Sequence, residues 1–182
     1  MPRTVRLTFP EVPSTGWSRA SWNVQSLRGQ LGIGMTEAEA NKTLARRFVE
    51  EIWNQKRPEL IEQFVAGDYT RVSPSGTLRG AQGLRQDYDM YMSAFPDGHV
   101  QIEDVLCEGD KVALRFVATG TQTGKLGEVA ASSKAVRVSG TAMVRVANGR
   151  IAEEHVVWDT LSLMQQIGAV PEFARVTRPA QQ

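Results

Sequence analysis

Apolar side chains recur at helical spacing in the first part of the chain. Leu44, Phe48 and Ile52 fall on one stripe in residues 36–57. Thr36 and Glu39 precede this stripe with the spacing of a capping box, in which the threonine hydroxyl and the glutamate cap the first turn of a helix. We therefore expect an amphipathic helix to begin at Thr36.

Two further helices are expected in the first half. Pro58 stands where a second, short helix would begin, because proline suits the first helical position. In residues 81–95, large apolar side chains recur at i, i+4, i+7 and i+11, and Pro96 then ends the pattern. Between these helices, residues 68–72 read as a short strand followed by a turn.

The spacing then changes to the near-alternation of β-branched residues that is typical of strands. Asn148-Gly149 joins the last pair of strands and is a strong hairpin signal. Residues 120–134 form a long connection of small residues, a length that is often a lid or a binding loop. The expected strands cover residues 100–107, 111–119, 134–147 and 150–158.

Helices followed by a long antiparallel meander define an α+β fold. Long strands twist, so the sheet should curl into a cone, and helices against its concave face should enclose a pocket. A last short helix, TLSLMQQIG, should end at Gly168, with Pro171 beyond it. We expect the convex face of the sheet to pair with a second copy, which gives a homodimer.

Composition narrows the class of protein. The chain has 182 residues, a formal net charge of +1 and 41% apolar residues, as expected for one globular domain. The balanced charge argues against a nucleic-acid platform, and no apolar run approaches the length of a membrane helix. Cys107 is the only cysteine and there are two histidines, so we expect no disulfide, no metal site and a cytoplasmic location.

The ends of the chain differ from the middle. Residues 1–34 contain four arginines and one acidic residue and show no apolar period. We expect them to be a flexible or non-native extension, preceding a true start at Met35, although their composition weakly resembles a transit peptide. Residues 35–172 should form the domain, and residues 173–182 a C-terminal tail.

The order of these elements resembles the SnoaL-like polyketide cyclase family, within the superfamily that has the nuclear transport factor two fold. The stretches that carry the resemblance are RRFVEEIWNQ, the run from AFPDGHV to ATGTQTG, NGRIAEEHVVWD and LMQQIG. The resemblance implies an intramolecular aldol ring closure on a polyketide-like ester, without metal or organic cofactor. It also implies that an aspartate at the end of the last long strand is the general acid/base, and Asp159 matches that position.

Asp159 has two interpretations. It follows the strand HVVW and precedes the last helix, so it either caps this helix or points into the pocket as a proton-transfer group. His155 lies on the same face of the strand as Asp159, because i and i+4 share a face. We expect both to face the cavity, where His155 would modulate Asp159 or orient a carbonyl group.

A second set of residues is expected to bind a hydrophobic small-molecule substrate. Arg115 lies inside an apolar strand, where a guanidinium could bind a carbonyl oxygen or an oxyanion, and His99 follows a turn. Each member also has an ordinary structural role open to it, as core, salt-bridged or turn residue. The full set is Trp53, Tyr69, Tyr88, Tyr91, Met92, His99, Arg115 and Met143.

The leading hypothesis is therefore a small enzyme that performs acid/base chemistry on a carbonyl compound without a cofactor. A hydratase, dehydratase or isomerase that uses the same carboxylate is a second enzymatic possibility. A non-catalytic protein that binds a small ligand in the same pocket is the rival from another class. Replacement of Asp159 by asparagine should separate them, because a binding protein would tolerate it.

Overall fold

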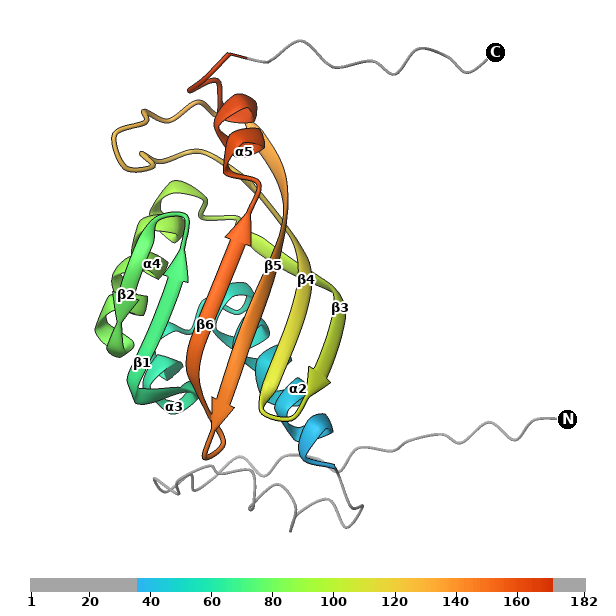
Figure 1. Cartoon of the computed structure of the whole chain (residues 1–182). Coiled ribbons are helices and arrows are strands. Elements are labelled where there is room, and N and C mark those ends of the chain that lie inside the picture. Colours follow the sequence, from blue (N-terminus) through green and yellow to red (C-terminus); the bar gives the residue numbers. More distant parts are fainter. Residues whose placement is uncertain (1–35, 172–182) are drawn as a thin grey trace, which may run out of the picture.

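The computed structural model describes residues 36–171 (Figure 1). The expected extension over residues 1–34 and the expected tail over 173–182 lie outside these residues. Within the described part, helices precede a meander of strands, and the α+β prediction is confirmed. None of the helices in residues 36–171 is both long and apolar enough to cross a membrane.

The helices begin and end close to the predicted positions. The Thr36 hydroxyl accepts a hydrogen bond from the Glu39 backbone amide at 3.2 Å, and Gly168 ends the last helix with a φ of 83°. The first helix widens into a π-helical segment, which the sequence pattern did not indicate. The helical elements are α2 (Glu37–Phe48), η1 (Val49–Asn54), η2 (Pro58–Leu60), α3 (Ile61–Phe64), α4 (Gly80–Ala94) and α5 (Thr160–Ile167).

The strands form one 6-stranded sheet in the order β2-β1-β6-β5-β4-β3. Neighbouring strands are antiparallel except β1 and β6, which are parallel. Asn148 and Gly149 both have positive φ in the turn between β5 and β6, as their hairpin signal predicted. The strands are β1 (Val65–Ser73), β2 (Gly76–Arg79), β3 (His99–Glu108), β4 (Lys111–Thr121), β5 (Ala135–Ala147) and β6 (Arg150–Trp158).

The helices α2, α3 and α4 lie against one face of the curved sheet, and α5 follows the end of β6 (Figure 1). The inner residues of the strands pack against these helices in one main core, which includes Phe48, Ile52 and Leu84. A second cluster joins α5 to the long loop between β4 and β5, where Leu126 of the loop and Leu163 of α5 are both buried. This layering places a cavity between the helices and the concave face of the sheet.

A β-bulge in β6 decides which of its side chains face inward. Val146 of β5 pairs with Ile151, but Arg145 pairs with Glu153, so Ala152 is an extra residue on β6. An added residue reverses the alternation beyond it, because side chains point to opposite faces with a period of two. Glu154, Val156 and Trp158 consequently face the helices.

Candidate functional site

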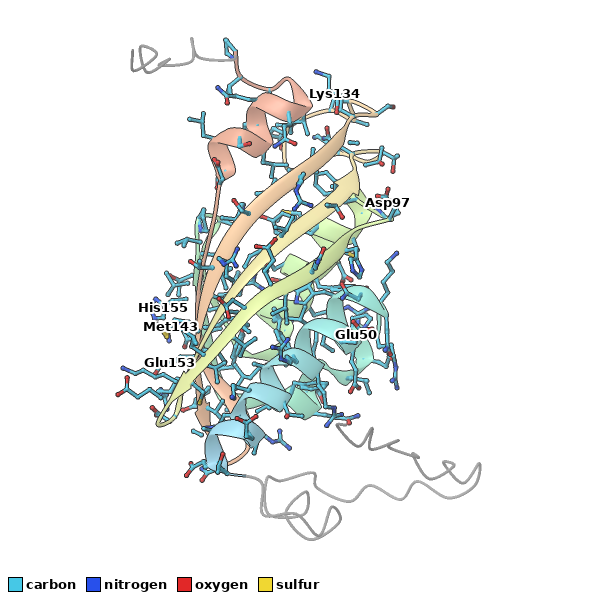
Figure 2. All side chains as sticks on the ribbon, turned by 90° about the vertical axis from the view of Figure 1, so that its right-hand side faces the viewer. Glu50, Asp97, Lys134, Met143, Glu153 and His155 are labelled. Carbon is cyan, nitrogen blue, oxygen red and sulfur yellow. The ribbon has the colours of Figure 1, made fainter. Side chains whose placement is uncertain are left out.

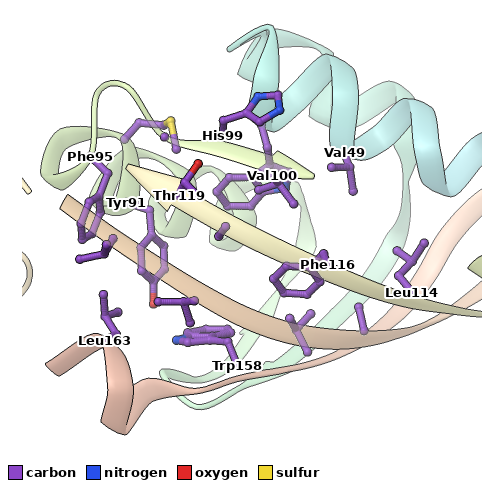
Figure 3. A pocket seen from close by; sticks show the side chains of 18 of the residues that line it. Val49, Tyr91, Phe95, His99, Val100, Leu114, Phe116, Thr119, Trp158 and Leu163 are labelled. Carbon is purple, nitrogen blue, oxygen red and sulfur yellow. The ribbon is translucent and has the colours of Figure 1, made fainter. Parts of the chain in front are cut away.

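The cavity has a volume of about 160 Å³ and a mostly apolar wall. An apolar cavity of about this size is large enough to hold a benzene ring. In Figure 3, Tyr91 from α4 meets Trp158 from β6 at one side, and their rings lie edge to face at a centroid distance of 5.9 Å. The residues of the wall are Val49, Trp53, Arg71, Tyr91, Met92, Phe95, Gly98, His99, Val100, Leu114, Phe116, Ala118, Thr119, Val136, Val138, Ala142, Glu154, Val156, Trp158 and Leu163.

Arg71 and Glu154 give this apolar wall a charged region. Each is only 6% exposed, and they come from the parallel neighbours β1 and β6. Arg71 Nε lies 3.9 Å from Glu154 Oε2, and Arg71 Nη1 lies 3.5 Å from Oδ2 of Asp87, a buried residue of α4. Tyr69 donates a hydrogen bond of 2.5 Å to Glu154 Oε2 from behind the wall.

Burial and neighbouring charges shift the pKa values of Tyr69, Arg71 and Asp87. Burial and the charge of Glu154 raise the pKa of Tyr69, so its hydroxyl keeps its proton and donates a hydrogen bond to Glu154. Burial raises the pKa of Asp87, while the Arg71 guanidinium opposes that rise. Burial alone would lower the pKa of Arg71, but the negative charges around it, Glu154 first, leave the pKa raised. Arg71 therefore remains a cation.

The geometry leaves one oxygen of Glu154 available to a ligand. Tyr69 and Arg71 both approach Oε2, whereas Oε1 makes no hydrogen bond with any residue in the range 36–171. A buried carboxylate whose second oxygen faces an apolar cavity can accept a proton from a bound molecule and return it. Arg71 is the positive charge beside it.

Four residues expected from the sequence to bind substrate do line the cavity, namely Trp53, Tyr91, Met92 and His99. Trp53 comes from η1, where the ring also packs against Tyr88 at a centroid distance of 5.5 Å. The Tyr91 hydroxyl lies 3.0 Å from the Ser75 hydroxyl in the β1–β2 turn. His99 is exposed at the first residue of β3, so it belongs to the rim. Their part in substrate binding stays a prediction.

The other expected binding residues are placed differently. Tyr69 and Tyr88 are buried in the main hydrophobic core and are not part of the cavity wall. Arg115 is exposed and pairs with Glu103, and Met143 is 46% exposed, since both lie on the outer face of the sheet. The prediction that these four residues contact the cavity is corrected accordingly.

The predicted placement of Asp159 and His155 in the cavity is wrong. Both side chains are exposed and lie outside the wall. Figure 2 shows His155 projecting from the outer face beside Met143 and Glu153. Asp159 caps α5, where Oδ1 accepts a hydrogen bond of 2.8 Å from the Ser162 amide. The bulge at Ala152 turns His155 to the outer face of β6, and Asp159 lies beyond the strand, which ends at Trp158.

Sequence reasoning missed Arg71, Asp87 and Glu154 as site residues. Asp87 carried a usable signal, because it falls on the same stripe of α4 as Leu84 and Tyr91, at i+3 and i−4. A carboxylate on a buried helix face needs a cation nearby. Nothing in the residues of β6 distinguished Glu154 from its neighbour Glu153, because the bulge is not visible in the pattern.

The described residues contain no group of three or more His, Cys, Asp or Glu side chains arranged to hold a metal ion. The polar groups in the wall of the cavity include a carboxylate, a guanidinium, a phenol, the hydroxyl of Thr119 and, at the rim, an imidazole.

The curved sheet and the cavity that the helices enclose define the fold of nuclear transport factor two and ketosteroid isomerase. A protein from Catenulispora acidiphila, described as having a ketosteroid isomerase-like fold and solved with trimethylamine, is 19% identical with a TM-score of 0.60. That match covers 69% of this chain and 92% of the other. The model of the SnoaL-like polyketide cyclases matches residues 43–167. The chain belongs to this family.

Two solved structures show the same fold at low identity. A protein from Jannaschia sp. CCS1, assigned to the SnoaL-like polyketide cyclases, is 23% identical with a TM-score of 0.69, covering 77% of this chain and 100% of the other. AclR from Streptomyces galilaeus, assigned as a hydroxylase, is also 23% identical with a TM-score of 0.68, covering 77% and 88%. No curated protein sequence matches the chain. Family and fold together support a small-molecule cyclase or isomerase-like role.

Proposed function

We propose that the protein transfers a proton at a carbon next to a carbonyl group of a hydrophobic small molecule, with Glu154 as the general acid/base. The observation that carries the proposal is the position of Glu154, a buried carboxylate that lines an apolar cavity beside a cation. Proton removal from such a carbon gives an enolate, which is the first step shared by aldol ring closure and by isomerisation. Neither reaction requires a group that residues 36–171 lack.

Tyr69 and Arg71 support the same role from two sides. Tyr69 fixes the carboxylate through its bond to Oε2, so Oε1 is the oxygen that would meet the substrate. Arg71 is a buried cation, so its positive charge stabilises a nearby negative charge more strongly than an exposed cation would, because electrostatic interactions are stronger away from solvent. The aromatic wall would hold the substrate in one orientation.

Ring closure of a polyketide-like ester is the specific reaction that we propose on the basis of the family. After Glu154 takes the proton, the new carbanion attacks a second carbonyl of the same molecule, and Glu154 returns the proton to the alkoxide that forms. The cavity contributes by holding the two reacting parts close together, which is mainly an entropic effect. A homodimer and a cytoplasmic location stay predictions of the sequence.

The first prediction tests Glu154 without knowledge of the natural substrate. The ketone 2-tetralone carries activated methylene protons, and deuterium uptake from D₂O, followed by mass spectrometry, reports their removal. Glu154→Gln keeps the size and the bond to Tyr69 but cannot accept the proton. We expect the protein-catalysed exchange to fall by about 100- to 10,000-fold.

Glu153→Gln is the matched control, because Glu153 is the adjacent carboxylate on the outer face and pairs with Arg145 at 2.6 Å. This variant should exchange at the wild-type rate. Wild-type exchange in a folded Glu154→Gln variant would refute the assignment of the base. Binding of 2-tetralone without exchange above buffer would favour a non-catalytic binding protein instead.

A further inference from the structure

Arg71 is a buried cation whose donors lack hydrogen-bond partners. It is 6% exposed and lines the cavity. Its side chain donates no hydrogen bond to any residue of the described part of the chain, and Nε and Nη1 are buried without a partner. The nearest carboxylate oxygens, on Asp87 and Glu154, lie at 3.5 and 3.9 Å, which is beyond hydrogen-bonding distance.

Unpaired buried donors require an explanation, because a charged group deprived of both water and hydrogen bonds destabilises the fold. Arg71 is nevertheless held in a defined place. Its guanidinium carbon lies 5.4 Å from the centre of the Trp53 ring, and two carboxylates flank it. Nε and Nη1 face the two carboxylates, whereas Nη2 donates no hydrogen bond within residues 36–171 and is not fully buried. The N–H groups of Nη2 are therefore the donors that can bind an oxygen arriving with a ligand in the cavity.

The charges around Arg71 select the kind of oxygen. Asp87 and Glu154 already oppose the guanidinium charge, so a ligand carboxylate would bring a further negative charge into a buried region. A neutral carbonyl oxygen accepts the same hydrogen bonds without that repulsion. The apolar wall around the charged region favours an aromatic or alicyclic body for the rest of the molecule.

We propose that Arg71 forms a subsite for the carbonyl oxygen of a neutral, largely apolar ligand, with Asp87 and Glu154 holding the guanidinium in place. The proposal deepens the proposed function, on which it rests for the use of this cavity, and names the group by which the ligand is recognised. It concerns binding alone, so it can fail or hold independently of turnover by Glu154.

The experiment is an NMR titration of the full chain with acetophenone, ethylbenzene and benzoate, which share one ring and differ in the polar group. Acetophenone should shift the Arg71 Nε signal, which is assigned by its loss in Arg71→Lys, whereas ethylbenzene should shift only signals from the apolar wall. Benzoate should bind more weakly than acetophenone. An Nε signal that acetophenone leaves unmoved, tighter binding of benzoate, or no binding of acetophenone would overturn the proposal.

The variant Arg71→Met measures how much the guanidinium contributes to ketone binding. The affinity of acetophenone relative to ethylbenzene should fall by about tenfold or more, because hydrogen bonds to a charged group are lost with the ketone only. Using the ratio removes the difference in hydrophobicity between the two molecules. Arg115→Met, a change of an exposed arginine on the outer face, should leave the ratio unchanged. An unchanged ratio in Arg71→Met would also overturn the proposal, and if that variant does not fold, the wild-type Nε shift decides.

Discussion

Two carboxylates near the end of β6, Glu154 and Asp159, have different roles. Glu154 points into the cavity and meets Tyr69, whereas Asp159 is exposed and accepts the Ser162 amide. A carboxylate in an N-cap satisfies one of the free amides at the start of a helix. Because Asp159 is exposed, its charge is solvated and needs no cation beside it.

The cap predicts how stability depends on Asp159. Asp159→Asn should leave the free energy of unfolding nearly unchanged, because asparagine caps helices about as well as aspartate. Asp159→Ala should lower it by about 1 kcal/mol, since the amide of Ser162 loses its partner. Urea denaturation of the two variants measures both values. Equal losses in both variants would show that the charge, rather than the cap, matters.

The site residues were predictable to different degrees. Trp53, Tyr91 and Met92 line the cavity as predicted, because helical spacing shows which face of a helix is buried. The inner residues of β6 could not be predicted, since the extra residue Ala152 exchanges the two faces of the strand and leaves no mark in the apolar pattern.

At the scale of elements, a carboxylate ties the end of α4 to β4. Asp97, in the turn between α4 and β3, accepts a 2.7 Å hydrogen bond from the Thr121 amide and a 2.8 Å bond from its hydroxyl. Figure 2 shows Asp97 near the end of the strands. The two bonds, that of the amide first, lower the pKa of Asp97 below its ordinary value of 3.8.

A lowered pKa gives a defined pH dependence. The ionised form stabilises the fold above pH 3.8, and this contribution is lost as the pH falls through the lower pKa of the folded state. Asp97→Asn should therefore lower the melting temperature at pH 7, and the difference from wild type should shrink toward pH 3. Asp110→Asn, in the β3–β4 turn, is the control. A difference that stays constant with pH would contradict the role assigned to ionised Asp97.

The kinds of element were predictable more fully than their details. Alternation and helical spacing gave the four long strands and the main helices, because each reflects the burial of one face. Two features were not predicted. The strand β2 is only 4 residues long, and η1 adopts π-helical geometry where the Asn54 side chain pairs with the backbone of Val100.

At the scale of the whole molecule, the outer face of the sheet carries exposed apolar side chains. Leu106 is 68% exposed and Val157 is 60% exposed. The successive pairings of β3 with β4, of β4 with β5 and of β5 with β6 place Leu106, Met143 and His155 in one row across this face. Exposed apolar groups that lie together on a sheet are suited to contact with another protein surface.

The expected homodimer can be tested on this face. Val157→Lys and Leu106→Lys should convert the protein to monomer, because each buries a charge in the expected interface. Leu161→Lys, which changes a 49% exposed leucine on α5, should leave the dimer intact. Sedimentation velocity distinguishes the two states. A wild-type protein that sediments only as monomer at micromolar concentration would contradict the expectation.

The proposed reaction depends on which carboxylate of the molecule moves the proton. The most direct measurement is deuterium exchange into 2-tetralone by Glu154→Gln and Asp159→Asn, side by side and with the folded state of both variants checked. If Glu154 is the base, the exchange rate of Glu154→Gln falls by about 100-fold or more, and Asp159→Asn retains the wild-type rate. Loss of exchange in Asp159→Asn with full exchange in Glu154→Gln would contradict that role for Glu154.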